Sequence, residues 1–173
     1  MYHKNFFFLI LSIFIIVIII FYDNKIEKNT TPLNLNNTHI CANDSMIILD
    51  YKGPKAQIIW KDNSRSYYCE VREAFYESTN KTRIKNIKYF FVQDFSDVEW
   101  DSYKDKWMLA QDAYYVIDSN MNGAMGLTYV PFSDINAAKK FHINYGGKLL
   151  DYNDITSTTL TDSSILLKNR IIF

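Results

Sequence analysis

Four side chains near residue 40 could bind a soft metal ion: His39, Cys41, Asp44 and Met46. Thiolate, thioether and imidazole groups favour Cu(I) over magnesium or calcium, whereas a carboxylate is a poor ligand for Cu(I). A structural explanation competes with the metal site. Met46 would open a buried strand, and Cys41 would form a disulfide with Cys69, the only other cysteine. Composition alone favours the structural explanation, because methionine and cysteine are usually buried.

Two further methionines flank a glycine-containing turn in the sequence MNGAM. Met121 and Met125 are four residues apart, so their thioethers could face one soft cation. Packing is the ordinary role of methionine, which fills irregular gaps in protein cores. We keep Met125, together with Cys69, as a candidate ligand, and expect His142 to face solvent.

The chain lacks the common signatures of catalysis and of nucleic-acid binding. It has no G-x-S-x-G motif, no phosphate-binding loop and no convincing pairing of a nucleophile with a histidine. Without an H-x-x-x-H or C-x-x-C pair, a closed zinc site is not expected. Lys and Arg number 19, and Asp and Glu also number 19, with no basic block. We therefore predict neither an enzyme nor a nucleic-acid-binding protein.

The N-terminal segment is strongly apolar. No charged residue interrupts 6–22, a length at the short end of what spans a bilayer as a helix. No small-x-small cleavage site follows, and no cysteine stands in a lipoprotein-like position after it. We predict an uncleaved transmembrane anchor over residues 1–25, followed by a polar linker over 26–38.

The residues after the linker predict one compact α+β domain over residues 39–155. Each half contains an apolar run that ends in an aspartate, a glycine-containing turn, a second apolar run, a helix-like segment and a further strand. We predict two similar ββαβ units, at about 44–98 and 107–155. In the second unit, Ser133 is expected to cap a helix that ends at Gly146. Residues 156–173 form a tail that opens with a polar, linker-like run.

Several motifs together resemble the NosL family, whose members are membrane-attached copper-binding accessory proteins. The matching motifs occur in the family order and are GPKAQI at 53–58, QDAYYVIDS at 111–119, NGAMG at 122–126, VPF at 130–132 and the ending GGKLLDYNDI at 146–155. The resemblance implies two ββαβ units, an extracytoplasmic location and no catalytic turnover. It also implies that Cu(I) is bound and supplied to nitrous oxide reductase during denitrification.

The chain departs from the NosL pattern at two ligand positions. The family has Cys-Gly-Met before its first strand, where this chain has Asp44-Ser45-Met46. Some relatives carry a second cysteine three residues earlier, and Cys41 occupies that position. A histidine of the family pattern is replaced by Tyr51.

The resemblance leaves two functions open. In the first, the chain is a single-pass protein of the cytoplasmic membrane whose periplasmic domain is a copper metallochaperone. It would bind Cu(I) through Cys41 and Met46, with His39, Cys69 and Met125 as further candidates, and would work with nitrous oxide reductase or its maturation machinery. In the second, the same scaffold is a structural or interaction protein with a Cys41–Cys69 disulfide.

The NosL fold is also reminiscent of organomercurial lyases, which use two cysteines and an aspartate to cleave carbon–mercury bonds. Cys41, Cys69 and Asp44 could correspond to that triad. A resemblance of fold is weak support for an activity, so we expect no enzyme.

Overall fold

The structure is a computed structural model that describes residue 8 and residues 10–21 and 30–162. The chain divides into two compact units, one ending at Thr31 and one beginning at Pro32. In the first unit, residues 10–21 are helical. No helix in the described part of the chain is both long enough and apolar enough to cross a bilayer. The transmembrane helix predicted over 1–25 lies partly outside the described residues.

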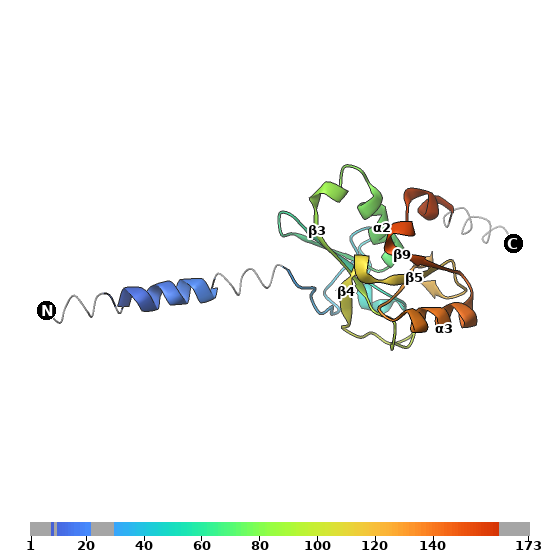
Figure 1. The fold of residues 1–173 in the computed structure, drawn as a ribbon, viewed down its shortest axis with the longest axis horizontal. Coiled ribbons are helices and arrows are strands. Elements are labelled where there is room, and N and C mark those ends of the chain that lie inside the picture. Colours follow the sequence, from blue (N-terminus) through green and yellow to red (C-terminus); the bar gives the residue numbers. More distant parts are fainter. Residues whose placement is uncertain (1–7, 9, 22–29, 163–173) are drawn as a thin grey trace. The chain divides into compact units, whose positions relative to one another are not determined.

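A four-stranded antiparallel sheet forms the first half of the second unit (Figure 1). The strands lie in the order β2-β1-β3-β4, and helix α2 packs on β1 and β2. The central strand β1 is buried at every position except its last, as its apolar sequence predicts. The bounds are β1 (Ala56–Trp60), β2 (Arg65–Tyr68), α2 (Val71–Thr79), β3 (Ile87–Gln93) and β4 (Trp107–Leu109).

A three-stranded antiparallel sheet forms the second half, in the order β8-β5-β9, and helix α3 packs against it. In both sheets the first strand of the set lies in the middle, and a helix connects the second strand to the third. A two-stranded ribbon, β6 with β7, is inserted between β5 and β8. The bounds are β5 (Tyr114–Ile117), β6 (Asn122–Gly123), β7 (Gly126–Leu127), β8 (Val130–Phe132), α3 (Ile135–Tyr145) and β9 (Lys148–Asp151).

Short 3-10 helices connect several of these elements. They are η1 (Ile48–Asp50), η2 (Ile84–Asn86), η3 (Ala110–Asp112) and η4 (Tyr152–Asp154).

One aromatic cluster joins the two sheets into a common core. Phe75 of α2 makes edge-to-face contacts with Phe90 of β3 and Tyr115 of β5, each with ring centroids 5.2 Å apart. Such pairs contribute about 0.5–1.5 kcal/mol beyond the area that they bury. The Tyr115 hydroxyl donates to the carbonyl of Ala110 at 2.6 Å, so this buried polar group is satisfied. The two halves therefore share a core.

The cap of α3 differs from the prediction. Asp134, not Ser133, is the N-cap residue, and its carboxylate accepts the N–H of Asn136 at 3.0 Å. Ser133 instead donates its N–H and hydroxyl to Asp94. The C-terminal prediction was correct, because the helix ends at Gly146 with a φ of +71°, a conformation that favours glycine.

The packed domain extends beyond both predicted boundaries. Leu35, within the predicted linker, is buried against the cysteine-containing cluster. At the other end, residues 157–162 are helical and place Leu160 in the main core. The polar run that begins the predicted tail is therefore not a linker as far as residue 162, and the apolar end of the tail lies outside the described residues.

Asp94 connects the end of β3 to the start of α3. Its buried carboxylate accepts hydrogen bonds from Ser96 and Ser133 and pairs with Lys106 at 3.0 Å. Burial alone would raise the pKa of Asp94, but the hydrogen bonds from both serines outweigh it. The pKa therefore lies well below its ordinary value.

Asp94→Asn should lower the free energy of unfolding by about 2–4 kcal/mol at pH 7, because it removes charged hydrogen bonds in a buried site. Because the pKa of Asp94 is lower in the folded protein than in the unfolded chain, the ionised carboxylate stabilises the folded protein at pH values above the unfolded pKa of about 3.9. This stabilisation is lost as the pH falls further. The difference between wild type and variant should therefore shrink below pH 4 in urea denaturation curves. Asp97→Asn, which removes an exposed partner of Lys106, is the control. An equal effect of the two substitutions would contradict this role for Asp94.

Candidate metal centre

A short closed loop presents Cys41. Ile40 and Ile47 form an isolated antiparallel bridge, and the N–H of Cys41 donates to the carbonyl of Met46 at 2.8 Å. Within the loop, the Asp44 carboxylate accepts the N–H of Met46 at 3.0 Å. Ser45 has a φ of +63°, a left-handed conformation that glycine adopts at lower cost. These contacts fix the position of the Cys41 sulfur.

Cys69 lies directly after β2 and two residues before α2 begins. The N–H of Ala42 donates to the carbonyl of Tyr67 at 2.8 Å, which holds the Cys41 loop alongside β2. As a result, the Sγ atoms of Cys41 and Cys69 are 3.2 Å apart. Both are free thiols, with 1 % and 0 % of the residue exposed. The structure brings together the two cysteines that the sequence left as alternative ligands or disulfide partners.

The two thiols differ in acidity because of their hydrogen bonds. The Cys69 thiol and the Cys69 N–H both point at the Sγ of Cys41, at 3.2 and 3.4 Å. These bonds lower the pKa of Cys41 despite its burial, whereas donation to Cys41, together with burial, raises the pKa of Cys69. Cys41 is therefore the more acidic thiol of the pair.

Two carboxylates complete the cluster. Glu73, in the first turn of α2, places Oε2 3.4 Å from the Sγ of Cys41 and 3.6 Å from that of Cys69. Asp44 contributes a carboxylate from the exposed side of the loop. One ligand atom from each residue of the group Cys41, Asp44, Cys69 and Glu73 lies within 4.8 Å of all the others. We call this group the thiol–carboxylate cluster.

A buried lysine lies close behind the thiol pair. Nζ of Lys55 donates to the carbonyl of Cys69 at 3.3 Å and to that of Lys52 at 3.1 Å. Burial lowers the pKa of Lys55 to about 8, against the opposing effect of the nearby charges of Cys69, Glu70 and Cys41. The positive charge of Lys55 therefore favours thiolate formation.

Met46 and His39 lie on either side of Cys41 in different surroundings. Met46 is partly buried and packs against the small cluster of Leu35, Cys41, Ile48 and Cys69. The ring of His39 contacts Tyr67 edge-on, and its Nδ1 is 2.9 Å from the side-chain oxygen of Asn36. Among the described residues, His39 is not part of the thiol–carboxylate cluster.

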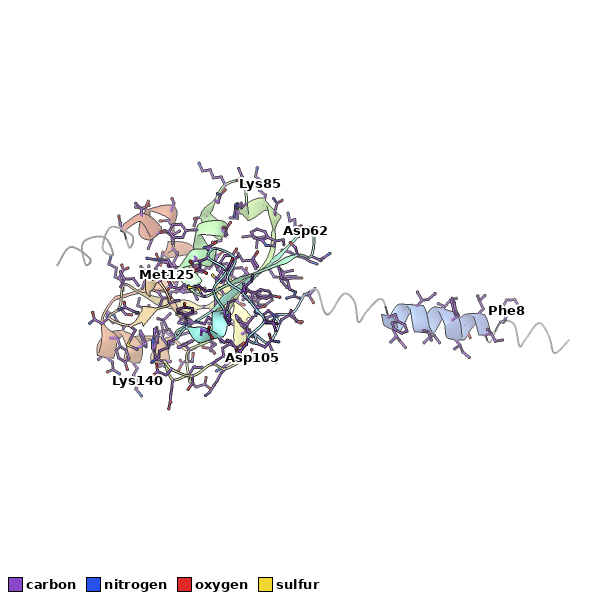
Figure 2. All side chains as sticks on the ribbon, turned by 180° about the vertical axis from the view of Figure 1, so that it is seen from behind. Phe8, Asp62, Lys85, Asp105, Met125 and Lys140 are labelled. Carbon is purple, nitrogen blue, oxygen red and sulfur yellow. The ribbon has the colours of Figure 1, made fainter. Side chains whose placement is uncertain are left out.

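Met125 lies on the β6–β7 ribbon. Its N–H donates to the buried carboxylate of Glu70, next to Cys69, while 50 % of Met125 is exposed. Because Glu70 is the N-cap of α2, this bond places Met125, labelled in Figure 2, beside the start of that helix. Neighbouring Ala124 packs against the cysteine-containing core cluster. The ribbon therefore lies beside the thiol pair, with Met125 at the surface.

Glu73 is a candidate metal ligand that our sequence analysis missed. Its position in the first turn of α2 follows from the helix start at Val71, but Cys69 precedes the helix, so the spacing Cys69-x-x-x-Glu73 alone did not predict that the two side chains meet. Asp44 was considered only as a poor Cu(I) ligand.

Comparison with known proteins identifies the family. Residues 32–160, well over half of the chain, match the NosL family model. The chain belongs to the NosL family.

Similar proteins support this assignment. The chain is 32% identical over 136 residues to the copper-binding lipoprotein NosL of Achromobacter cycloclastes, covering 76% of this chain and 68% of the relative. It is 24% identical over 141 residues to the copper-binding lipoprotein NosL of Stutzerimonas stutzeri, covering 81% and 74%. The crystal structure of the copper chaperone NosL from Shewanella denitrificans superimposes with a TM-score of 0.71 at 29% identity, covering 74% of this chain and 97% of that one. These relatives are named as binding proteins, not as enzymes.

The Cys41 loop can be compared with the Cys-Gly-Met pattern of the NosL family. The Cys-Gly-Met pattern of NosL places glycine where Ser45 adopts a left-handed conformation. This chain has Ser45 where the pattern has glycine, and Asp44 where the pattern has cysteine. The sulfur that lies beside Cys41 in this chain is that of Cys69, at 3.2 Å.

The shared proton of the two cysteines can be tested by substitution. In Cys69→Ala the Cys41 sulfur loses the hydrogen bond of the Cys69 thiol, so the pKa of Cys41 should rise. In Cys41→Ala the pKa of Cys69 should fall, because Cys69 no longer donates a hydrogen bond to Cys41. The Cβ chemical shift of ¹³C-labelled cysteine, followed with pH, measures both. An unchanged pKa of Cys41 in Cys69→Ala would contradict the shared proton.

Proposed function

We propose that this NosL-family domain binds one Cu(I) through the thiolates of Cys41 and Cys69 and passes it to another protein. The observation that carries the proposal is the 3.2 Å separation of two buried sulfurs. Thiolates are the ligands that select Cu(I), and both sulfurs can reach one ion with small movements. Copper binding by the NosL relatives supports the same choice of metal.

The proposed site differs from the pair Cys41 and Met46 that the sequence suggested. Met46 packs beside the thiols, so its thioether is available as a weak third ligand. Met125, exposed on the neighbouring ribbon, is placed to meet an ion that enters or leaves. His39 is bound to Asn36 and Tyr67, and we assign it to positioning the loop.

A low coordination number suits transfer of the metal to another protein. Two thiolates leave open positions on Cu(I), so a ligand from a partner can bind before the first thiolate leaves. The exposed side of the cluster, at Asp44, gives such a partner access, whereas Lys55 and the core close the opposite side. The proton on the Cys69 thiol leaves when Cu(I) binds, because the thiolate is the metal ligand.

The recipient and the location are further parts of the proposal. We propose that the domain works at a membrane outside the cytoplasm and that the recipient is nitrous oxide reductase or its maturation machinery. The NosL resemblance supports this role, and the relatives are named lipoproteins. The two sheets, each with its first strand in the middle, support two ββαβ units.

The distance between the sulfurs also favours a second candidate function. Thiols this close form a disulfide on oxidation, and the domain would then be an interaction protein without metal. Titration of free thiols in the protein purified without reductant separates the two candidates. Two free thiols per chain support copper binding, and none supports the disulfide.

Cu(I) titration of the reduced protein against a competing chelator should show tight binding of one ion per chain. Cys41→Ser and Cys69→Ser should each weaken binding by about 100-fold or more, or about 2.8 kcal/mol, because each removes one of two thiolates. Met46→Leu should have a smaller effect, and Lys140→Ala, on the exposed face of α3, is the control and should have none. Unchanged affinity in Cys69→Ser would contradict the proposed site.

A further inference from the structure

Basic side chains of the first sheet gather at the end opposite the thiol pair. Cys69 follows β2 at one end of the β1–β2 pairing, whereas the turn at residues 61–64 joins the two strands at the other end. The N–H of Lys61 donates to the carbonyl of Asn86 at 2.8 Å, which places η2 and the start of β3 beside this turn. Segments distant in the chain therefore share one surface.

Positive charge is concentrated on this surface. The segments 61–65 and 77–88 contain six basic residues but only two acidic ones, whereas the whole chain has 19 of each. Figure 2 labels Asp62 and Lys85 at this end of the domain. Five of the six basic residues are exposed and the other is partly buried. We call the six the basic patch: Lys61, Arg65, Lys81, Arg83, Lys85 and Lys88.

The two acidic residues neutralise little of the patch. The carboxylate of Asp62 accepts the N–H and the hydroxyl of Ser64, at 2.9 and 2.6 Å, within its own turn. Glu77 pairs with a single cation, Arg83. A shallow cavity of about 680 Å³ opens in the patch, and its lining residues are Trp60, Lys61, Asp62, Ser64, Arg83 and Asn86.

Apolar side chains accompany the charge. The indole of Trp60 is partly buried at the cavity, and its N–H donates to the hydroxyl of Ser66 at 2.9 Å, which fixes the ring. Ile84 of η2 is 48 % exposed. Tryptophan and aliphatic side chains set among lysine and arginine are typical of protein surfaces that lie at the interface between membrane and water.

We propose that the basic patch binds the anionic phospholipid head groups of a membrane, with a head-group phosphate in the cavity beside Trp60. Lysine and arginine near a membrane surface are attracted to anionic lipids, and the guanidinium group of arginine matches the geometry of phosphate. This inference rests on the membrane location that is part of the proposed function. It would turn the thiol pair, at the other end of the strands, away from the bilayer.

The path of the chain favours a membrane over an acidic protein as the partner. Leu33, near the start of the domain, forms two backbone hydrogen bonds with the side chain of Gln57, at 3.0 and 2.7 Å. Gln57 precedes Trp60 by three residues, which is about 10 Å along β1. Any membrane attachment that precedes Pro32 therefore joins the domain on the strand that carries Trp60.

Hydrogen–deuterium exchange of the full-length protein in nanodiscs tests the proposal, because it locates the contact within the chain. Amides of residues 61–65 and 83–88 should exchange at least threefold more slowly with about 30% phosphatidylglycerol in the bilayer than with phosphatidylcholine alone. About 0.5 M salt should remove the difference, because it screens the charges.

Charge-reversal variants test whether the patch is responsible. The double substitution Lys61→Glu and Lys85→Glu should abolish the slower exchange. Lys139→Glu with Lys140→Glu makes the same change of charge on the exposed face of α3, and this matched control should keep the effect. Cu(I) affinity should stay within twofold of wild type in both double variants, because neither changes a proposed copper ligand.

Each other outcome overturns a definite part of the account. A protein that stays in both kinds of nanodisc without slower exchange in phosphatidylglycerol refutes the lipid contact alone, as does slower exchange that persists in the patch variant. The same slowing by inorganic phosphate or by soluble polyglutamate, in phosphatidylcholine nanodiscs, would replace the membrane with a free anion or an acidic protein. Loss of the protein from both nanodiscs would refute the membrane location as well. Slower exchange without Cu(I) binding would refute copper transfer and keep the lipid contact.

Discussion

The hydrogen bond from the Ala42 N–H to the Tyr67 carbonyl joins two segments on which the site depends. It pins the Cys41 loop to β2, immediately before the chain reaches Cys69. Both donor and acceptor are backbone groups, so the contact survives changes in the side chains around it. Without it, the two sulfurs would belong to a free loop and to the end of a strand, with no fixed distance between them.

The rest of the fold makes that contact stable. β1 lies between β2 and β3, and its buried residues hold β2 in register. Phe75 then anchors α2 to both sheets, which fixes the first turn of the helix and with it Glu73. Lys55, just before β1, places its ammonium group behind Cys69. The thiols are thus buried against a well-packed core, and the exposed residue Asp44 lies beside them.

The sequence predicted those features that local patterns determine. Three apolar runs correspond to β1, β3 and β5, and the glycine pair after Tyr145 marked the end of α3. The strand expected to open at Met46 was wrong, because this run makes one isolated bridge at Ile47 and continues into the 3-10 helix η1. The N-cap was misassigned by one residue because Ser133 and Asp134 are both good caps, and a distant partner, Asp94, binds the serine. Leu160 was missed because a single apolar residue in a polar run shows no periodicity, and its burial depends on the core it enters.

The site could be predicted only in part, for a related reason. Cys41 was recognisable from its neighbours, but its closeness to Cys69 results from pairing between segments distant in the chain. Glu73 resembles an ordinary solvent-facing carboxylate in the first turn of a helix until the two sulfurs are seen beside it. Chemistry that depends on long-range contacts is visible only once the fold is known.

X-ray absorption spectroscopy of the Cu(I)-loaded protein tests the central claim most directly, because it counts the sulfur atoms bound to copper. The proposed site predicts two cysteine sulfurs in the wild-type protein and the loss of one in Cys69→Ser. A first shell dominated by nitrogen or oxygen, or the same sulfur count in Cys69→Ser as in wild type, would contradict binding by this thiol pair.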